Sequence, residues 1–299
     1  MLGINSLIAT LMPYLPKWFV QPFAKPYVAG ESLDEAIDIV RDLNKKGYAA
    51  TMDILGEFVE SKDEANEIKD AYTQVIQQIA ENGLDSTISV KLTHLGLGID
   101  VDLGESNIMA LTQAGKNHGV GVTIDMENSP YTSQTFNIYK RALSIHDNMG
   151  TVIQAYLYRS LDDIKSLDSP RLNLRICKGI YNESPEIAIQ NRTAINDNYV
   201  EMAKTLLNGD GYACLATHDL SLIDRLETLI ESENIPSDRF EFQVLYGVPM
   251  GNRLEALKAK GYKVRVYVPF GEAWFEYSVR RLKENPKIIS YVMGNWFRG

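Results

Sequence analysis

The chain has 299 residues, of which 45% are hydrophobic and 23% charged, as in an ordinary globular protein. Its formal net charge of −9 leaves no basic stripe to neutralise phosphates, which excludes a nucleic-acid partner. Two cysteines cannot form a disulfide framework and indicate a reducing compartment. We expect a cytoplasmic protein without a signal peptide, because no apolar run approaches the roughly 18 residues of a membrane span.

The first 32 residues differ from the rest because they combine apolar side chains with prolines. Prolines at this density forbid one long helix. We expect a helical arm over residues 1–32 that packs on the main domain. Alternatively, the arm contacts a membrane surface or a partner, since apolar arms of this kind can lie in an interface.

From residue 33 onward, short β-rich runs alternate with longer helical patterns. The predicted strands are 49–54, 87–92, 121–125, 151–156, 172–177, 213–217, 240–245 and 263–268. The predicted helices are 32–46, 62–82, 104–118, 132–148, 160–167, 185–207, 220–233, 251–260 and 273–284, with glycines 47, 83, 119, 150 and 261 as helix stops. This alternation predicts an α/β protein with one domain over 33–299, and eight strands favour a closed (βα)8 TIM-type barrel.

Polar side chains stand near almost every predicted strand end, where such a barrel carries its chemistry. A purely structural barrel would need none of them. In chain order they are Glu57, Lys91, Asp125, Gln154, Arg175, Lys178, Thr217, His218, Asp219, Tyr246 and Tyr267.

Lys91 lies in an apolar strand, where a lysine is costly unless it is paired or used. It could form a Schiff base, face an anion, or simply be exposed at the strand end. Asp125 could pair with Lys91, serve only in a structural ion pair, or bind a metal with Glu127.

Arg175 and Lys178 place two cations before Gly179, which suits a phosphate or an electron-rich cofactor. Thr217 or Asp219 could simply cap the next helix. Alternatively, the N-terminus of that helix could bind a phosphate. The chain has no Gly-x-Gly-x-x-Gly motif and no P-loop, so a dinucleotide would not be bound in the Rossmann manner.

Near the C-terminus, Tyr277, Arg280, Arg281 and Glu284 share one face of a predicted helix. Two adjacent guanidiniums repel unless an anion lies between them, and arginine grips a carboxylate through two hydrogen bonds. The alternative is a solvated helix face with Arg–Glu pairs.

Together these segments resemble the proline dehydrogenase family, in its short monofunctional bacterial form, over roughly residues 47 to 290. The motifs are Val90-Lys91-Leu92-Thr93, Thr123-Ile124-Asp125-Met126-Glu127, Arg175-Ile176-Cys177-Lys178-Gly179, Ala216-Thr217-His218-Asp219, Phe242-Gln243-Val244-Leu245-Tyr246-Gly247, Tyr267-Val268-Pro269-Phe270-Gly271 and Tyr277-x-x-Arg280-Arg281-Leu282. The resemblance implies a distorted barrel that binds FAD non-covalently. It also implies oxidation of L-proline to Δ1-pyrroline-5-carboxylate, with hydride transfer from C5 to flavin N5. The electrons would pass to a quinone, which requires at least transient, peripheral membrane contact.

The resemblance also assigns roles to residues. Those implied to bind proline are Arg280, Arg281, Lys91, Tyr267, Tyr277 and Leu245, with Asp125 holding Lys91 and Glu57 pairing with a clamp arginine. Those implied to bind FAD are Met126, Gln154, Lys178, Gly179, Ile180, Thr217 and His218, with Arg175 near N5 and Glu284 either balancing the arginines or reaching the flavin.

Two other functions remain open at this point. An aldolase-like lyase would use Lys91 or Lys178 as a Schiff base. A non-catalytic amino-acid-binding barrel would keep the carboxylate clamp but hold no flavin. No side chain stands out as a dedicated base for the proline amine.

Overall fold

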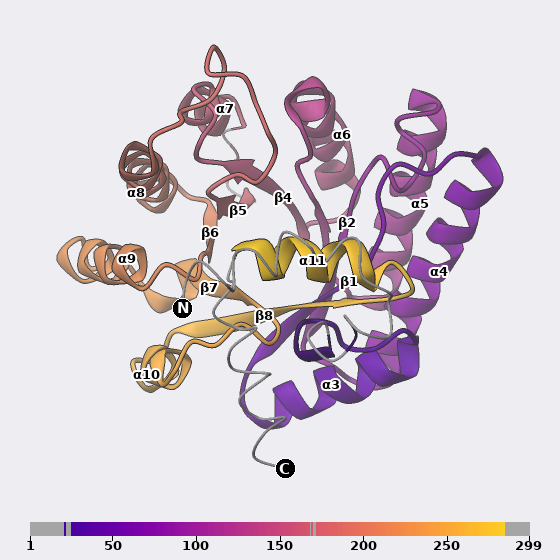
Figure 1. Ribbon diagram of the computed structural model, residues 1–299, viewed down its shortest axis with the longest axis horizontal. Coiled ribbons are helices and arrows are strands. Elements are labelled where there is room, and N and C mark those ends of the chain that lie inside the picture. Colours follow the sequence, from indigo (N-terminus) through magenta and orange to yellow (C-terminus); the bar gives the residue numbers. More distant parts are fainter. Residues whose placement is uncertain (1–20, 22–24, 168, 170–171, 285–299) are drawn as a thin grey trace.

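The computed structural model describes residues 21, 25–167, 169 and 172–284. Its strands form a closed barrel in the order β1 to β8, and β8 pairs with β1. Every neighbouring pair is parallel. Helices surround this ring, as Figure 1 shows, and the predicted (βα)8 barrel is therefore confirmed.

The strands are β1 (Ala49–Ile54), β2 (Ser86–Val90), β3 (Val122–Ile124), β4 (Met149–Gln154), β5 (Asn173–Cys177), β6 (Tyr212–Ala216), β7 (Phe240–Leu245) and β8 (Lys263–Phe270). The α-helices are α3 (Leu33–Lys45), α4 (Lys62–Glu81), α5 (Val101–His118), α6 (Thr132–Ile145), α7 (Ser160–Ser166), α8 (Arg192–Asn208), α9 (Leu220–Ser232), α10 (Arg253–Ala259) and α11 (Trp274–Glu284). Three short 3-10 helices are η2 (Lys25–Tyr27), η3 (Ser129–Tyr131) and η4 (Ser237–Arg239).

The largest error in the predicted bounds concerns the helix expected over 185–207, which begins only at Arg192. The residues before it form a loop that pairs with the loop after β4, since Ile189 N–H donates to Tyr156 O at 2.6 Å. Asn191 then caps the helix by accepting from Ala194 N–H. Contacts from another part of the chain therefore outweigh the local helical pattern.

Glycine 150 was also wrongly predicted as a helix stop. Gly150 lies inside β4, and α6 ends at Ile145. The next residue, His146, is the C-cap, and its ring nitrogen Nε2 lies 3.0 Å from Val120 O. At the other four glycines the prediction is confirmed, because each has a positive φ directly after its helix. They are Gly47, Gly83, Gly119 and Gly261.

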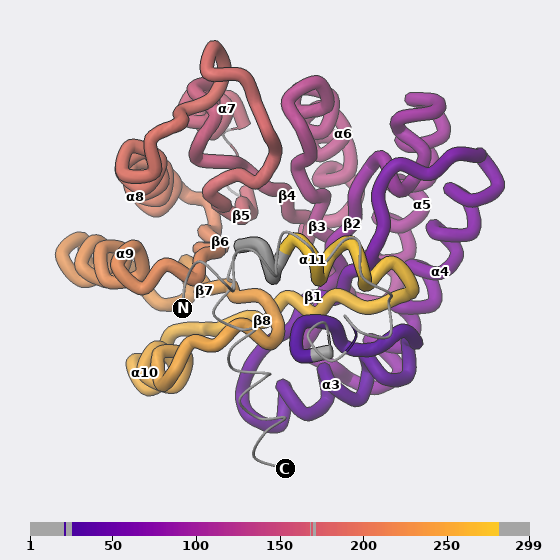
Figure 2. Tube along the Cα trace, in the orientation of Figure 1, coloured from indigo at the N-terminus to yellow at the C-terminus, as the bar shows by residue number. Residues whose placement is uncertain are grey.

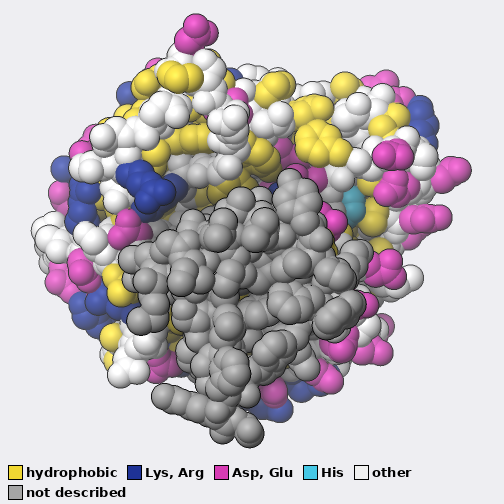
Figure 3. Space-filling model, in the orientation of Figure 1, with side chains coloured by type: hydrophobic (Ala, Val, Ile, Leu, Met, Phe, Trp, Pro, Cys, Tyr) yellow, Lys and Arg dark blue, Asp and Glu magenta, His cyan; other side chains and the backbone are white. Residues whose placement is uncertain are grey.

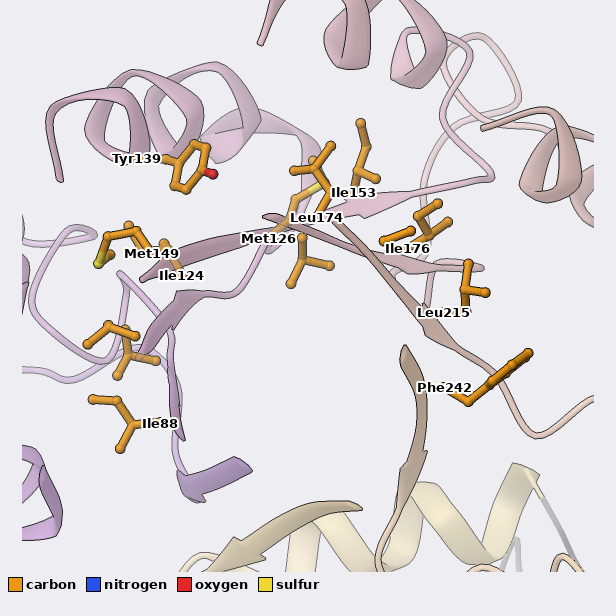
Figure 4. Close-up of a cluster of buried hydrophobic side chains, with 14 of the residues drawn as sticks. Ile88, Ile124, Met126, Tyr139, Met149, Ile153, Leu174, Ile176, Leu215 and Phe242 are labelled. Atoms are coloured by element: carbon orange, nitrogen blue, oxygen red, sulfur yellow. The ribbon is translucent and has the colours of Figure 1, made fainter. Parts of the chain in front are cut away.

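Alternation along the strands divides the barrel into two environments. One set of side chains points outward beneath the helices and is apolar, including Ile88, Ile124, Leu174 and Phe242 (Figure 4). The residues between them point into the barrel and are largely polar. They include Thr51, Asp53, Ser89, Asp125, Arg175, Glu241, Gln243 and Arg265, most of them buried. The interior is therefore filled largely by polar groups instead of the usual branched aliphatic layers.

Helix α11 lies across the carboxyl ends of the strands, over the centre of the ring (Figure 2). No described helix is both long and apolar enough to cross a bilayer. The arm predicted over 1–32 falls mostly outside the described residues.

The last part of that arm runs over the end of β8. Ala29 N–H donates to Pro269 O at 2.9 Å, and Gly271 N–H donates to Gly30 O at 3.0 Å. The chain also passes so close to the loop after β7 that a Cβ on Gly247 would overlap the carbonyl oxygen of Pro26. Gly247 has a φ of +75°, so both space and backbone conformation require glycine there.

A pair of glycine substitutions tests this close approach. Gly251 also has a positive φ, but a Cβ there would meet nothing within 4 Å. Both Gly247→Ala and Gly251→Ala should lose about 1 kcal/mol to the left-handed backbone. Gly247→Ala should lose about 2 kcal/mol more, because the overlap displaces residues 26–27. Urea unfolding measures both, and equal losses would contradict the expected close contact.

Candidate active site

Four charged side chains meet at the carboxyl end of the barrel interior: Asp53, Lys91, Asp125 and Arg175. Lys91 Nζ lies 3.4 Å from Asp53 Oδ2 and 3.6 Å from Asp125 Oδ2. Arg175 Nη1 lies 2.7 Å from Asp125 Oδ1. None of the four side chains is more than 14% exposed. Two cations and two anions balance one another, which is what allows so many charges to be buried together.

The charge state of Lys91 follows from its neighbours. Burial by itself would lower its pKa, but the carboxylates of Asp53 and Asp125 outweigh burial and hold the pKa above its ordinary value. A Schiff-base lysine must be able to lose its proton. Lys91 is instead held as an ammonium, which disfavours the aldolase-like alternative.

Asp53 was missed by the sequence analysis, although the signal was present. It is the one charged residue of the apolar strand β1, and the argument made from the sequence for Lys91, which directly follows β2, applies to it equally. Tyr72 on α4 donates its hydroxyl hydrogen to Asp53 Oδ1 at 2.9 Å. Burial raises the pKa of Asp53, while the positive charge of Lys91 opposes that rise.

Arg175 is held at several points. Its Nε donates to Gln243 Oε1 at 2.7 Å, and its Nη1 donates to Ser89 Oγ at 3.0 Å as well as to Asp125. Its guanidinium carbon lies 5.4 Å from the centre of the Tyr267 ring. Burial would lower the pKa of Arg175, but Asp125 reverses the effect and raises it. The structure thus brings together Lys91, Asp125, Arg175 and Tyr267, as the strand ends predicted.

Helix α11 adds a second group of side chains over this cluster. Tyr277 is buried, whereas the Arg280 side chain is 46% exposed. Arg280 Nη1 lies 3.4 Å from Glu57 Oε1, so the two side chains pair across the barrel mouth. The predicted Arg281 and Glu284 belong to this helix, but their side chains lie outside the described residues.

The ends of β3 and β4 carry two further predicted residues in buried positions. Gln154 donates through Nε2 to Glu127 O at 3.0 Å, and Met126 is 5% exposed. Glu127 accepts from both the backbone N–H and the hydroxyl of Thr93. Its carboxylate is therefore engaged with Thr93, and among the described residues no group of three His, Cys, Asp or Glu side chains could hold a metal ion.

The ends of β5 and β6 form a third group. Lys178 Nζ donates to Asp219 Oδ2 at 2.6 Å, and Asp219 caps α9 by accepting from Leu222 N–H. Thr217 Oγ1 accepts from Asp219 N–H at 3.1 Å. His218 Nε2 accepts from Leu245 N–H at 2.8 Å, which places its ring proton on Nδ1. The helix cap is therefore made by Asp219, and Thr217 orders the turn before it.

Beside this third group, the surface carries apolar side chains and a glycine with a special conformation. Ile180 is 59% exposed and Leu220 is 52% exposed. Gly179 has a φ of +112°, and a Cβ there would overlap the ring of Tyr156. Figure 3 shows apolar atoms exposed in the upper half of this face. Exposed Ile and Leu next to fixed cations are typical of a surface that a partly apolar, anionic ligand covers.

A surface cavity of about 420 Å³ lies farther out, among the loops after β3, β4 and β5. It is lined by Ser129, Pro130, Leu157, Tyr158, Arg159, Glu186 and Ile187. None of the residues that form the buried charge cluster lines it. The candidate active site is therefore the buried charge cluster at the carboxyl end of the barrel, and not this surface cavity.

Comparison with known proteins identifies the family. The sequence profile described as "Proline dehydrogenase" matches residues 36–293. This chain belongs to the proline dehydrogenase family. It is 38% identical over 284 residues to "Proline dehydrogenase 1" of Bacillus subtilis subsp. natto, covering 95% of this chain and 94% of that protein. It is 34% identical to "Proline dehydrogenase" of Deinococcus radiodurans, covering 92% of this chain and 90% of that protein.

A solved structure supports the same fold. The crystal structure of proline utilization A (PutA) from Bdellovibrio bacteriovorus inactivated by N-propargylglycine superimposes with a TM-score of 0.82 at 26% sequence identity. The match covers 89% of this chain and 33% of that chain, so the chain spans about a third of the larger protein's length.

His94, in the loop after β2, is buried beside Gly56, the residue that precedes Glu57. The imidazole is 5% exposed and packs against Gly56, where a Cβ would overlap its ring. Among the described residues its Nδ1 has no hydrogen-bond partner. Burial, helped by the charge of Lys91, lowers the pKa of His94 to about 4. The neutral ring therefore fills space under the loop that carries Glu57.

This pKa predicts a pH-dependent stability. Because the folded chain holds the pKa of His94 at about 4, below the ordinary 6.5, the unfolded chain takes up the proton first as the pH falls. Above pH 6.5, His94 is neutral in both states and does not change the free energy of unfolding. Between pH 6.5 and pH 4 the unfolded state is stabilised by protonation, so the free energy of unfolding falls by about 3 kcal/mol.

Urea unfolding at several pH values measures this effect. His94→Gln should remove about 3 kcal/mol of the fall in unfolding free energy between neutral pH and the pKa of His94. His118→Gln, at an exposed position of α5, should keep the wild-type dependence. A His94 variant with an unchanged dependence would contradict the assignment.

Proposed function

We propose that this chain oxidises L-proline to Δ1-pyrroline-5-carboxylate with non-covalently bound FAD and passes the electrons to a quinone. The observation that carries the proposal is the buried, charge-balanced cluster of Asp53, Lys91, Asp125 and Arg175 beneath helix α11, in a member of the proline dehydrogenase family. Lys91 and Arg175, both paired with Asp125, supply fixed positive charge in this cluster.

The carboxylate of proline would bind between Arg280, Arg281 and Lys91. The separation of 3.4 Å between Arg280 and Glu57 is long for a charge-assisted hydrogen bond, so a substrate carboxylate can compete for the guanidinium. Asp125 and Asp53 hold Lys91 in place and in its charged form. Tyr267, Tyr277 and Leu245 would surround the apolar ring.

The residues on the other side of the cluster fit FAD. Arg175 supplies a buried positive charge, and Ile180 supplies exposed apolar surface. Lys178 lies beside the first turn of α9, and Gly179 lets the adjoining backbone pack on the ring of Tyr156. Met126, Gln154, Thr217 and His218 would complete this side, and Glu284 is assigned by family resemblance alone. FAD, when bound, would supply the acceptor for two electrons.

The reaction requires the proline nitrogen to lose a proton and C5 to lose a hydride as the N=C5 double bond forms. A quinone then takes up the two electrons together with two protons and becomes a quinol. Lys91 is protonated, so it does not serve as the base. The positive charges of Lys91 and Arg175 instead favour the neutral amine over the ammonium, which eases loss of the proton. Binding by the clamp supplies orientation.

We place the protein in the cytoplasm, with transient peripheral contact to a membrane. The membrane contact is needed because a quinone is apolar and resides in the lipid. The segment best suited to that contact by its sequence is the N-terminal arm. An amino-acid-binding barrel without flavin stays as the competing function, since it would use the same carboxylate clamp.

Anaerobic titration of the purified protein with L-proline is the deciding experiment. The protein should carry the visible absorption bands of oxidised flavin, and proline should bleach them. A menadione-type quinone should restore the bands, because it reoxidises the reduced flavin. A colourless protein that takes up no FAD would defeat the proposal and favour the amino-acid-binding alternative.

Replacement of Arg280 tests the clamp. Arg280→Met should raise the proline KM by roughly 10- to 100-fold, because a charge-assisted hydrogen bond contributes about 1.5–3 kcal/mol. The bound flavin content should not change. Arg141→Met, which removes an exposed arginine paired with Glu105 on the outer helices, is the matched control and should leave KM unaltered. An unchanged KM in the Arg280 variant would exclude this arginine from the clamp.

A further inference from the structure

Gln243 is a buried amide on the inner face of β7 that is hydrogen-bonded on both sides. Its Oε1 accepts from Arg175 Nε at 2.7 Å. Its Nε2 donates to Glu241 Oε1 at 2.6 Å. The side chain is among the polar residues buried in the barrel, at 5% exposure. Gln243 therefore connects the catalytic end of the barrel to the polar groups below it.

The two partners leave the amide only one orientation. A flipped amide would turn its NH2 group toward the guanidinium and its oxygen toward the carboxylate, and both contacts would be repulsive. Glu241 is itself fixed, because Arg265 donates from Nε to Oε1 at 2.6 Å and from Nη2 to Oε2 at 3.1 Å. Burial would raise the pKa of Glu241, but Arg265 outweighs burial and lowers it, so the carboxylate is ionised.

The contact with Gln243 decides how Arg175 sits. Asp125 and Ser89 both hold the guanidinium at Nη1, which alone would leave the plane free to turn about that edge. Gln243 holds the opposite edge at Nε. A neutral acceptor fixes the group without adding negative charge, whereas a second carboxylate in its place would offset the charge of Arg175.

We propose that Gln243 is a positioning residue for Arg175, which fixes the guanidinium in the barrel and, by being neutral, keeps its positive charge available to the reduced cofactor. This inference rests on the proposed function, since it concerns the charge that Arg175 presents to a bound flavin. It goes beyond that function by assigning a role to a side chain whose two hydrogen bonds are made to Arg175 and Glu241.

Gln243→Glu tests the proposal with almost no change in shape. A new carboxyl group would lie between Arg175 and Glu241. While protonated, it could accept from Arg175 and donate to Glu241, as the amide does; once ionised, it would offset the charge of Arg175. The midpoint potential of the bound flavin should therefore match the wild type at low pH. It should fall progressively below the wild type as the pH rises.

The expected size is at least a tenfold loss in stabilisation of the reduced flavin, which is about 30 mV for a two-electron couple. The kcat should fall with the potential, while the proline KM changes by less than about threefold, because the clamp is untouched. Gln113→Glu, which adds the same charge at an exposed position of α5, should keep the wild-type potential at every pH.

Gln243→Leu is the second variant, for use if the glutamate variant does not fold. It removes the acceptor at Nε, so kcat should again fall about tenfold or more and the potential should become more negative. Flavin-loaded variants with wild-type potential and kcat at all pH values would overturn the inference and leave the proposed function standing. A wild-type protein that binds no flavin would overturn the proposed function, and this inference with it.

Discussion

The pairing of buried charges inside the barrel is the constraint on which the rest of the structure depends. Burying Lys91 and Arg175 in this interior without Asp53 and Asp125 would be strongly unfavourable, because an unpaired buried charge costs several kcal/mol. The four side chains come from the ends of four strands, β1, β2, β3 and β5, so the cluster forms only when these strands are assembled in the barrel. Assembly of the barrel therefore also assembles the site.

Buried charges are also paired deeper in the barrel, below the site. Arg265 and Glu241 form a second ion pair deep in the barrel, and Gln243 connects it to Arg175. Arg265 also donates through Nη1 to Ala50 O at 2.5 Å. A run of hydrogen bonds thus extends from the base of the barrel to the mouth. Polar interiors of this kind fix positions more narrowly than apolar packing does, since each donor demands its own acceptor.

Helix α11 and the loops supply what the barrel interior cannot. The interior offers charge fixed in position, whereas a substrate must enter and leave. Arg280 is exposed, and its pairing with Glu57 is long, so this contact can be exchanged for a ligand. The buried charges of Lys91 and Arg175 are fixed, whereas Arg280 can exchange Glu57 for a ligand. This combination suits a small carboxylate substrate that must bind and leave.

Local sequence patterns determined a large part of this protein. The bounds of β1 and β7 agree with prediction to the residue, because apolar runs between turn signals are local properties. Lys91, Asp125 and Arg175 were found from the sequence, since a charge in an apolar strand is conspicuous by itself. The family resemblance added the cofactor and the substrate.

Tertiary structure alone decided the remainder. The start of α8 at Arg192 depends on hydrogen bonds from the loop after β4, which no local pattern contains. The charge of Asp53 is conspicuous in sequence, but its partners Lys91 and Tyr72 come from other elements. Gln243 lies within a family motif, but the sequence does not indicate a role for it, because the role of an amide depends on the groups on its two sides. Sequence reveals that a charge must be paired, and only the closed barrel reveals with what, because pairing is a property of distance in space and not along the chain.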